Sequence, residues 1–178
     1  MTHTIRQATA DDAGALAELA AVTFPLACPP ESSPEDIAAH LAGTLSERHF
    51  RAYLADPAVT VLVIDAGGGL RGYSLLVNRP ALDPDVASAL TALPSAELSK
   101  CYVHPGHHGL GAAADLMHAS IESAAAAGAR GMWLGVNSEN TRAIRFYEKS
   151  GFRKVGTKSF RLGSAVEHDF VMERPLGG

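Results

Sequence analysis

Residues 97–127 join a strand pattern to a long helix pattern through a short loop that is rich in glycine and histidine. The helix pattern, over residues 109–127, is rich in alanine, with Leu116 and Ile121 facing inward. Because the first turn of a helix leaves backbone N–H groups unpaired and carries partial positive charge, such a loop can hold a pyrophosphate. The same small residues also suit a helix that begins tightly packed against a sheet, and the segment alone leaves both interpretations open.

The patterns on either side place this segment in a mixed sheet. A capping box of Thr9 and Asp12 starts one helix, Ser33 caps another, and Gly67–Gly69 turns a hairpin. Strands are expected at 4–8, 59–65, 72–77, 97–103, 130–136, 152–156 and 166–172, and helices from Thr9, Ser33 and Ser46 and at 109–127 and 141–149. This order predicts a mixed α/β fold with one central sheet.

The composition is that of an ordinary globular protein. The chain has 178 residues, of which 47% are hydrophobic and 19% charged, so we expect one domain over residues 1–178. The formal net charge is −4 and no long basic stripe occurs, which argues against a nucleic-acid partner. No apolar run approaches the ~20 residues that span a bilayer, and no signal-peptide core is visible, so we expect no membrane partner and a cytoplasmic location.

Cysteine and histidine residues raise the question of thiol or metal chemistry. Two cysteines, Cys28 and Cys101, are too few for a disulfide scaffold and match no zinc spacing. His104, His107 and His108 lack a further ligand at metal spacing, so we expect no metal site. No histidine or acid is obviously placed to activate Cys101, which we therefore expect to be an inert strand thiol.

Two motifs compete for the glycine-bearing loop, and the first is a dinucleotide fingerprint. Residues 109–114 fit G-x-G-x-x-A. However, the first glycine lies well past Val103, whereas the fingerprint places it directly after the strand. The chain also ends in a hairpin pattern rather than in further βα units. The dinucleotide match is therefore weak.

The second motif starts with Val103-His104-Pro105 and continues with His108-Gly109-Leu110-Gly111-Ala112-Ala113. This run resembles the Q/R-x-x-G-x-G/A pyrophosphate loop of the GNAT superfamily of acyl-CoA-dependent N-acetyltransferases, with His108 in place of the usual Gln or Arg. Residues 140–152 resemble that family's N-x-x-A-x-x-F-Y-x-x-x-G-F signature, in the expected order and at about the expected spacing. The resemblance covers most of the chain.

A narrower resemblance is to bacterial spermidine/spermine N-acetyltransferases, on residues 133–136, 159–160 and 162–163 with Asp169 and Met172. The resemblance implies a mostly antiparallel, twisted sheet of about six or seven strands flanked by helices, with the cofactor at a splay between the two central strands. It implies acetyl transfer from acetyl-CoA to a small-molecule primary amine by direct attack in a ternary complex. A polyamine such as spermidine or spermine is the narrower expectation for the acceptor.

Tyr147 and Glu97 are the expected catalytic residues. A primary amine with a pKa of ~10.4 is almost fully protonated at pH 7, so its proton needs a route out. Tyr147 holds the family's tyrosine position and is expected to protonate the leaving thiolate. Glu97 is the candidate base, acting through water, and strand alternation places it on one face with Ser99, Cys101 and Val103. The plain alternatives are a half-buried aromatic and an exposed carboxylate at a strand end.

The resemblance also assigns residues to the cofactor. The backbone of Tyr102 and Val103 is expected to pair with the pantetheine arm, as an added strand would. Asn140 is expected to bind the same arm, to cap the following helix, or both, and Phe146 to be a core residue with an edge contact to the cofactor. The residues expected at the pyrophosphate are His108, Gly109, Gly111, Ala112 and Ala113.

A non-catalytic acyl-CoA-binding or sensing module on the same fold is the alternative function. The intact Tyr147 favours the enzyme, while His108 in place of Gln or Arg leaves room for the module. The sequence is also compatible with a homodimer. Acidic residues that could draw a polycation, or simply be solvated, are Glu31, Glu35, Asp36, Asp83 and Asp85.

Overall fold

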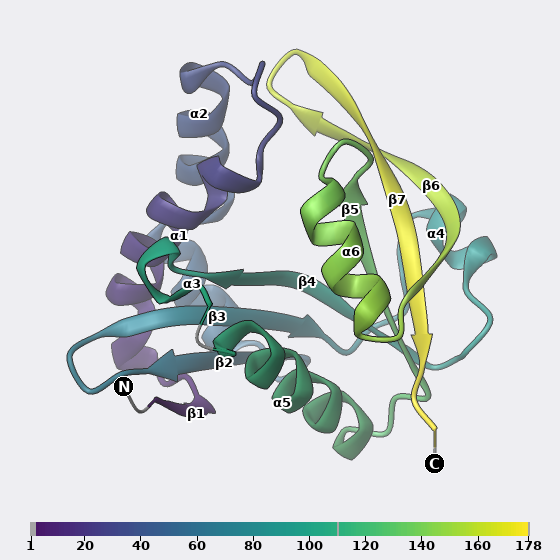
Figure 1. The fold of residues 1–178 in the computed structure, drawn as a ribbon, viewed down its shortest axis with the longest axis horizontal. Coiled ribbons are helices and arrows are strands. Elements are labelled where there is room, and N and C mark those ends of the chain that lie inside the picture. The colour runs from purple at the N-terminus through teal and green to yellow at the C-terminus, as the bar shows by residue number, and fades with distance from the viewer. Residues whose placement is uncertain (1–2, 110, 178) are drawn as a thin grey trace.

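A seven-stranded sheet forms the centre of the molecule, in the order β1-β2-β3-β4-β5-β7-β6 (Figure 1). The structure, a computed structural model, describes residues 3–109 and 111–177. The strands are β1 (Thr4–Gln7), β2 (Val59–Asp65), β3 (Leu70–Val77), β4 (Ser95–Val103), β5 (Gly131–Asn137), β6 (Arg153–Leu162) and β7 (Ala165–Pro175). The helices are α1 (Ala13–Ala27), α2 (Pro34–Thr44), α3 (Glu47–Ala55), α4 (Pro84–Ala89), α5 (Ala112–Ala126) and α6 (Thr141–Lys149), with short 3-10 helices η1 (Ala10–Asp12) and η2 (Pro105–His107). The expected mixed α/β fold is confirmed.

Helices cover both faces of the sheet because its central strands are apolar on both sides. In β2, Val61 and Val63 pack with α1 and α3, while Leu62 and Ile64 pack with Leu116 of α5. In the β5–β7 half, α5 and α6 share one face, and α4 covers the other. The sheet therefore has a helical layer on each side, and a binding site needs a break in the sheet itself.

That break lies between β4 and β5. These strands are parallel and pair only through Ser95–Glu97 and Gly131–Trp133, whereas the other neighbours are antiparallel. Beyond Glu97, β4 follows β3 to Val103, and β5 follows β7 to Asn137, so the two strands diverge (Figure 1). The splay expected between the two central strands is present.

A bulge at Ser99 corrects the predicted face of Glu97. Leu76 pairs with Leu98, but Leu75 pairs with Lys100, so Ser99 is an extra residue in β4. One inserted residue reverses the alternation beyond it. Glu97 therefore shares its face with Lys100 and Tyr102, on the side of α1, and not with Cys101 and Val103, which pack on the side of α5.

The long helix of the loop segment begins later than predicted. Gly109 and Gly111 have φ values of +82° and +74°, in the left-handed region that glycine tolerates and a right-handed helix excludes. α5 therefore starts at Ala112 rather than at residue 109, and Gly111 is its N-cap. The glycines belong to the loop, so their backbone is free to face a ligand.

The starts of the N-terminal helices follow their capping residues. The Asp12 carboxylate accepts a hydrogen bond from the Thr9 N–H at 2.8 Å, and Ser33 Oγ accepts one from the Asp36 N–H at 3.1 Å. The Thr9 box opens η1 rather than α1 itself. α1 also continues past Pro25, because the proline ring constrains the turn before it and not the residues after it.

Among the described residues, none of the helices is both long and apolar enough to cross a membrane.

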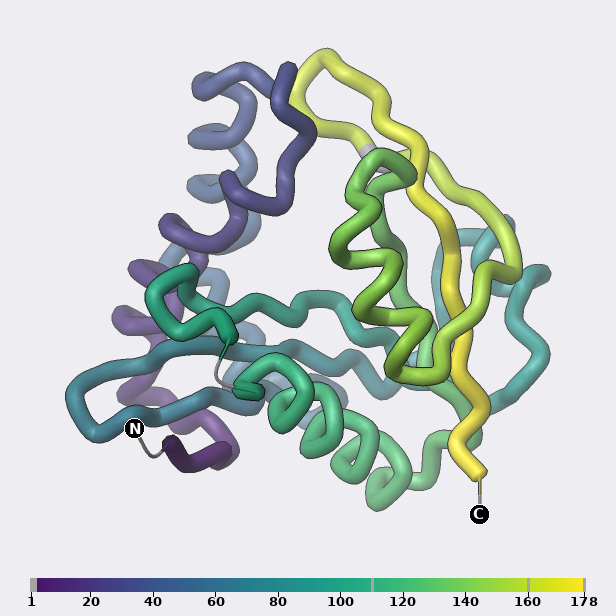
Figure 2. The backbone as a smooth tube through the Cα atoms, in the orientation of Figure 1, coloured from purple at the N-terminus to yellow at the C-terminus, as the bar shows by residue number. Residues whose placement is uncertain are grey.

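Two hairpins are longer than their patterns predict. β3 begins at Leu70 rather than at residue 72, and β6 and β7 pair from Arg153–Glu173 to Leu162–Ala165. Most residues of the outer part of the β6–β7 hairpin are exposed or half-buried, so this part carries no clear alternating pattern, although Leu162 near its turn is buried in the core. Its turn reaches α2: a side chain at Gly163 would collide with the Asp36 carboxylate. In Figure 2 this turn lies at the same end of the molecule as α2.

Candidate active site

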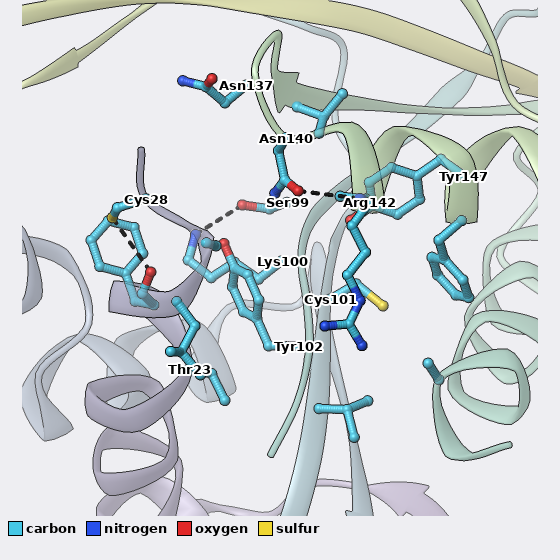
Figure 3. Close-up of a pocket in the computed structure, with 18 of the residues that line it drawn as sticks. Thr23, Cys28, Ser99, Lys100, Cys101, Tyr102, Asn137, Asn140, Arg142 and Tyr147 are labelled. Carbon is cyan, nitrogen blue, oxygen red and sulfur yellow. Dashed lines mark hydrogen bonds between the residues drawn. The ribbon is translucent and has the colours of Figure 1, made fainter. Parts of the chain in front are cut away.

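A cavity of about 700 Å³ lies where β4 and β5 separate. Its loop end is formed by residues 107–109 and 111–114, which lead into α5. Its charged end is formed by Glu97, Lys100, Lys158 and Asp169, beside apolar residues of α1. Every residue that the sequence assigns to catalysis or to a cofactor lines this cavity, and Figure 3 shows several of them around the gap.

The loop end presents backbone rather than side chains. A Cβ added to Gly109 or Gly111 would meet nothing within 4 Å, so the space beside both residues is open. Ala112 and Ala113 begin α5 and also line the cavity. Unpaired N–H groups at a helix start, with no side chain in front of them, suit a phosphate group. Leu110 lies outside the described residues.

His108 occupies the motif's basic position and is held by two contacts. Its Nε2 donates to the Val103 carbonyl at 2.9 Å, so this nitrogen carries the proton. Its Nδ1 accepts from the Arg142 guanidinium at 3.3 Å. Arg142, on the first turn of α6, thus brings a fixed positive charge to the loop end. Sequence reasoning missed Arg142, although it stands within the motif at residues 140–152.

Tyr147 approaches the gap from α6, whose start is capped by Asn140. The Asn140 side chain accepts from the Ala143 N–H at 3.2 Å, which confirms the predicted cap. The Tyr147 ring packs between Phe146 and Phe152, with centroids 5.6 and 6.0 Å away, and points toward β4 (Figure 3). Burial raises the pKa of Tyr147 well above its usual range, so the phenol keeps its proton at neutral pH.

Glu97 lies at the last residue pair before β4 and β5 separate. Burial raises the pKa of this carboxyl, and the nearby Lys100 and Lys158 ammonium groups oppose the rise. A carboxylate with a raised pKa accepts a proton more readily near neutral pH than an ordinary glutamate does. The position and raised pKa of Glu97 therefore favour the role of a base over the alternative interpretation, that of an exposed carboxylate at a strand end.

Lys100 projects to the same side of β4 as Tyr102, while Cys101 projects to the opposite side (Figure 3). Its Nζ donates to Ser99 Oγ at 3.0 Å and lies 5.9 Å from the centre of the Tyr53 ring. Burial lowers the pKa of Lys100, and Glu97 opposes the lowering. Sequence reasoning missed Lys100, because simple alternation places it on the other face from Glu97.

Lys158 and Asp169 form the far wall of the charged end. They pair across β6 and β7, with 3.8 Å between Lys158 Nζ and Asp169 Oδ2. Asp169 is 7% exposed, and its Oδ1 has no hydrogen-bond partner among the described residues. A Cβ on Gly135 of β5 would lie 2.5 Å from Lys158 Cε. The absence of a side chain at this position therefore allows Lys158 to lie beside Asp169.

Cysteine chemistry is not favoured in this cavity. Burial raises the pKa of Cys101 to about 12, so it is a thiol and not a thiolate at neutral pH. Burial also raises the pKa of Cys28, to about 11. Cys28 donates to the Phe24 carbonyl at 3.4 Å and lies at the end of α1. These thiols are weak nucleophiles, as the sequence predicted for Cys101.

Three carboxylates from three separate segments of the chain lie close together. Glu31, Glu139 and Glu167 place one oxygen each within 4.8 Å of the others, and each is exposed or half-buried. Repulsion from Glu31 raises the pKa of Glu139. Glu31 is one of the five acidic residues that the sequence analysis named. Glu139 and Glu167 are distant from it in sequence and lie beside it only in the folded chain.

A comparison with models of protein families shows which family the chain belongs to. The model described as "Acetyltransferase (GNAT) family" matches residues 16–152. The chain belongs to the GNAT acetyltransferase family. This confirms the resemblance seen in the loop and in residues 140–152, and it overturns the dinucleotide interpretation of residues 109–114.

Relatives of this GNAT protein share most of its length. An uncharacterized N-acetyltransferase of Mycobacterium tuberculosis is 48% identical over 165 residues, covering 93% of this chain and 98% of the relative. Another, from Lactobacillus delbrueckii subsp. lactis, is 28% identical over 149 residues, 82% of each chain. These names give no acceptor.

Solved structures show the same GNAT fold. The PaiA N-acetyltransferase of Thermoplasma acidophilum, in complex with coenzyme A, superposes with a TM-score of 0.77 at 21% identity, covering 98% of this chain and 99% of that one. YncA of Salmonella typhimurium, solved with acetyl-CoA, gives a TM-score of 0.65 at 24% identity, covering 100% and 96%. The expected mostly antiparallel GNAT sheet is confirmed.

Proposed function

We propose that the protein transfers an acetyl group from acetyl-CoA to a primary amine by direct attack in a ternary complex. One observation carries the proposal: a single cavity is lined both by the backbone of a phosphate-binding loop and by the half-buried acid and base candidates, Tyr147 and Glu97. Residues 1–178 act as one domain, since one sheet extends from β1 to β7. The GNAT relatives solved with coenzyme A or acetyl-CoA support this choice of donor.

The residues at the loop end fit coenzyme A. The N–H groups around Gly109, Gly111 and Ala112 would hold its pyrophosphate, and the Arg142 charge would complement it. The diverging edge of β4 at Tyr102 and Val103 would accompany the pantetheine arm. The His108 bond already occupies one acceptor position of the Val103 carbonyl, so that oxygen has one lone pair left. Bound acetyl-CoA supplies an activated thioester.

The proton transfers fall to Glu97 and Tyr147. Glu97 removes a proton from the incoming ammonium, directly or through water, because burial makes it a stronger base. Because its pKa is raised, Tyr147 is protonated at neutral pH before the reaction. It then donates this proton to the leaving sulfur. The splay brings the acid from α6 and the base from β4 to one cavity, so proximity contributes to the rate.

A polyamine is the narrower candidate acceptor, with one set of features in its favour and another against it. The resemblance at residues 133–136 and 162–163 and the carboxylates of Glu31, Glu139 and Glu167 support a polycation. Lys100 and Lys158 inside the charged end oppose one, since a second ammonium would face them at close range.

An acceptor panel tests the proposal. The protein is incubated with acetyl-CoA and primary amines that include spermidine, and release of free thiol is measured. Acetyl-CoA or CoA should also raise the melting temperature in proportion to its excess over Kd, and NAD should not. Binding of CoA without turnover of any amine would favour the acyl-CoA-sensing module instead. A shift with NAD and none with CoA would refute the proposed donor.

A further inference from the structure

The charged end contains cations that the proposed transfer does not use. Glu97 serves as the base, but Lys100 has no role in moving the amine's proton. Lys100 lies two pairing positions from Glu97 on the same face, because the bulge at Ser99 brings both to one side of β4. An acceptor that reaches Glu97 from this face would therefore lie on the same side of β4 as the Lys100 ammonium.

The Lys100 ammonium has hydrogen-bonding capacity to spare. An ammonium has three N–H donors, and one of them is used by Ser99 Oγ at 3.0 Å. The face of the Tyr53 ring lies 5.9 Å away and offers no lone pair. Among the described residues, no carboxylate oxygen lies within 4.0 Å of Lys100 Nζ. Burying an ammonium whose N–H donors lack acceptors costs folding free energy, unless an anion binds to those donors.

The other cation of this end is differently placed. Lys158 lies 3.8 Å from the Asp169 carboxylate, so its charge has a partner. The same cavity is also lined by Phe24, Leu45 and Leu162, which are 7%, 2% and 1% exposed. A ligand at the charged end therefore contacts the Lys100 ammonium, which has unused N–H donors, and the Glu97 carboxylate. It also contacts an apolar wall, formed by Phe24, Leu45 and Leu162.

We propose that the acceptor carries a carboxylate beside its amine, that Lys100 binds this carboxylate, and that the acceptor class is an α-amino acid with an apolar side chain. The Lys100 donors receive the carboxylate, the amine faces Glu97, and the side chain contacts the apolar wall. This inference rests on the proposed acetyl transfer and names its acceptor. It disfavours a polyamine, whose second ammonium would lie beside Lys100.

The test uses acceptor pairs that differ only by the carboxylate: L-leucine against isoamylamine, and L-phenylalanine against phenethylamine, with spermidine as a further acceptor. We expect kcat/KM to be on the order of 10- to 100-fold higher for each amino acid than for its matched amine, the range of a hydrogen bond to a charged group. Spermidine is expected to be a poorer acceptor than the amino acids.

Lys100→Met keeps the length of the side chain and removes the charge. The ratio of kcat/KM for amino acid over matched amine should fall by about 10- to 100-fold. Lys149→Met, on the exposed side of α6 away from the cavity, is the matched control and should keep the wild-type ratio. Because turnover also depends on folding, binding of N-acetyl-L-leucine with CoA present is measured by calorimetry for both variants. Only Lys100→Met should weaken it.

The outcomes separate the two proposals. Preference for spermidine or for the decarboxylated amines would overturn the amino-acid acceptor and leave the acetyl transfer standing. An equal loss with both members of each pair in Lys100→Met would also overturn it, since Lys100 would then serve the chemistry rather than recognition. If the wild-type protein binds CoA but acetylates no amine at all, both proposals fail together.

Discussion

The two ends of the cavity are built by different means. The loop end is made from one continuous segment, and it presents the backbone of residues such as Gly109 and Gly111. The charged end is made from side chains of β4, β6 and β7, which meet only because the sheet folds. A backbone cradle needs little beyond small residues at fixed spacing, whereas a set of charges needs each strand to be in register.

If the two ends are built separately, a change of acceptor need not change the binding of the donor. Substitutions at Lys100, Lys158 or Asp169 would change the charges of one end and leave the loop untouched. The loop tolerates little change, because positions 109 and 111 require left-handed backbone. If the two ends are separate, a substitution at one end should leave the other intact.

Tyr147→Phe should cause the largest loss. Removing the hydroxyl keeps the ring packed between Phe146 and Phe152 but removes the proposed proton donor to the leaving sulfur. We expect kcat to fall by roughly 10²–10⁴-fold, with a much smaller change in KM for acetyl-CoA. Steady-state kinetics with the best acceptor provide the measurement. Near-native turnover would remove Tyr147 from the chemistry.

Glu97→Gln should reduce the rate at neutral pH on the order of 10²-fold. Since burial raises the pKa of Glu97, the wild-type rate should itself fall as the pH is lowered through that raised pKa, where the base becomes protonated. At high pH more of the amine is neutral, so the Glu97→Gln defect should shrink while the Tyr147→Phe defect persists. Parallel pH–rate profiles for the two variants would contradict their separate roles.

Gly111→Glu should impair only the loop end. The substitution adds a negative charge where the pyrophosphate is expected, and CoA affinity should fall by more than about tenfold, measured by calorimetry. Gly128→Glu is the matched control, since Gly128 also has positive φ (+95°) and open space around it but lies beyond the far end of α5. An equal loss of CoA affinity in both variants would indicate backbone strain rather than a phosphate site.

Gly135→Ala should impair only the charged end. Its Cβ would lie 2.5 Å from Lys158 Cε and 3.4 Å from Asp169 Oδ2, so the lysine must move. Because the end of a lysine side chain is flexible, we expect KM for the acceptor to rise by only about threefold to tenfold, roughly 1 kcal/mol. The Kd for CoA should stay unchanged. A change in CoA affinity would show that the two ends are not separable.

The sequence predicts what is local and misses what depends on register. The bounds of α6 were predicted correctly, because the Asn140 cap and the apolar face between residues 141 and 149 are local features. The loop residues were predicted from local features too, and they line the cavity. The bulge at Ser99 leaves no clear mark in the sequence, so Glu97 was assigned to the wrong face and Lys100 was missed. The Lys158–Asp169 pair depends on β6 and β7 being in register over their whole length.

A crystal structure of the protein bound to CoA would show where the pyrophosphate and the sulfur lie. We expect the pyrophosphate to accept hydrogen bonds from the N–H groups around Gly111 and Ala112, and the CoA sulfur to lie between β4 and β5 within hydrogen-bonding distance of the Tyr147 hydroxyl. The side of the sulfur facing Glu97 and Lys100 should stay open for the acceptor. A CoA molecule bound elsewhere, or with its sulfur turned away from Tyr147, would contradict the account.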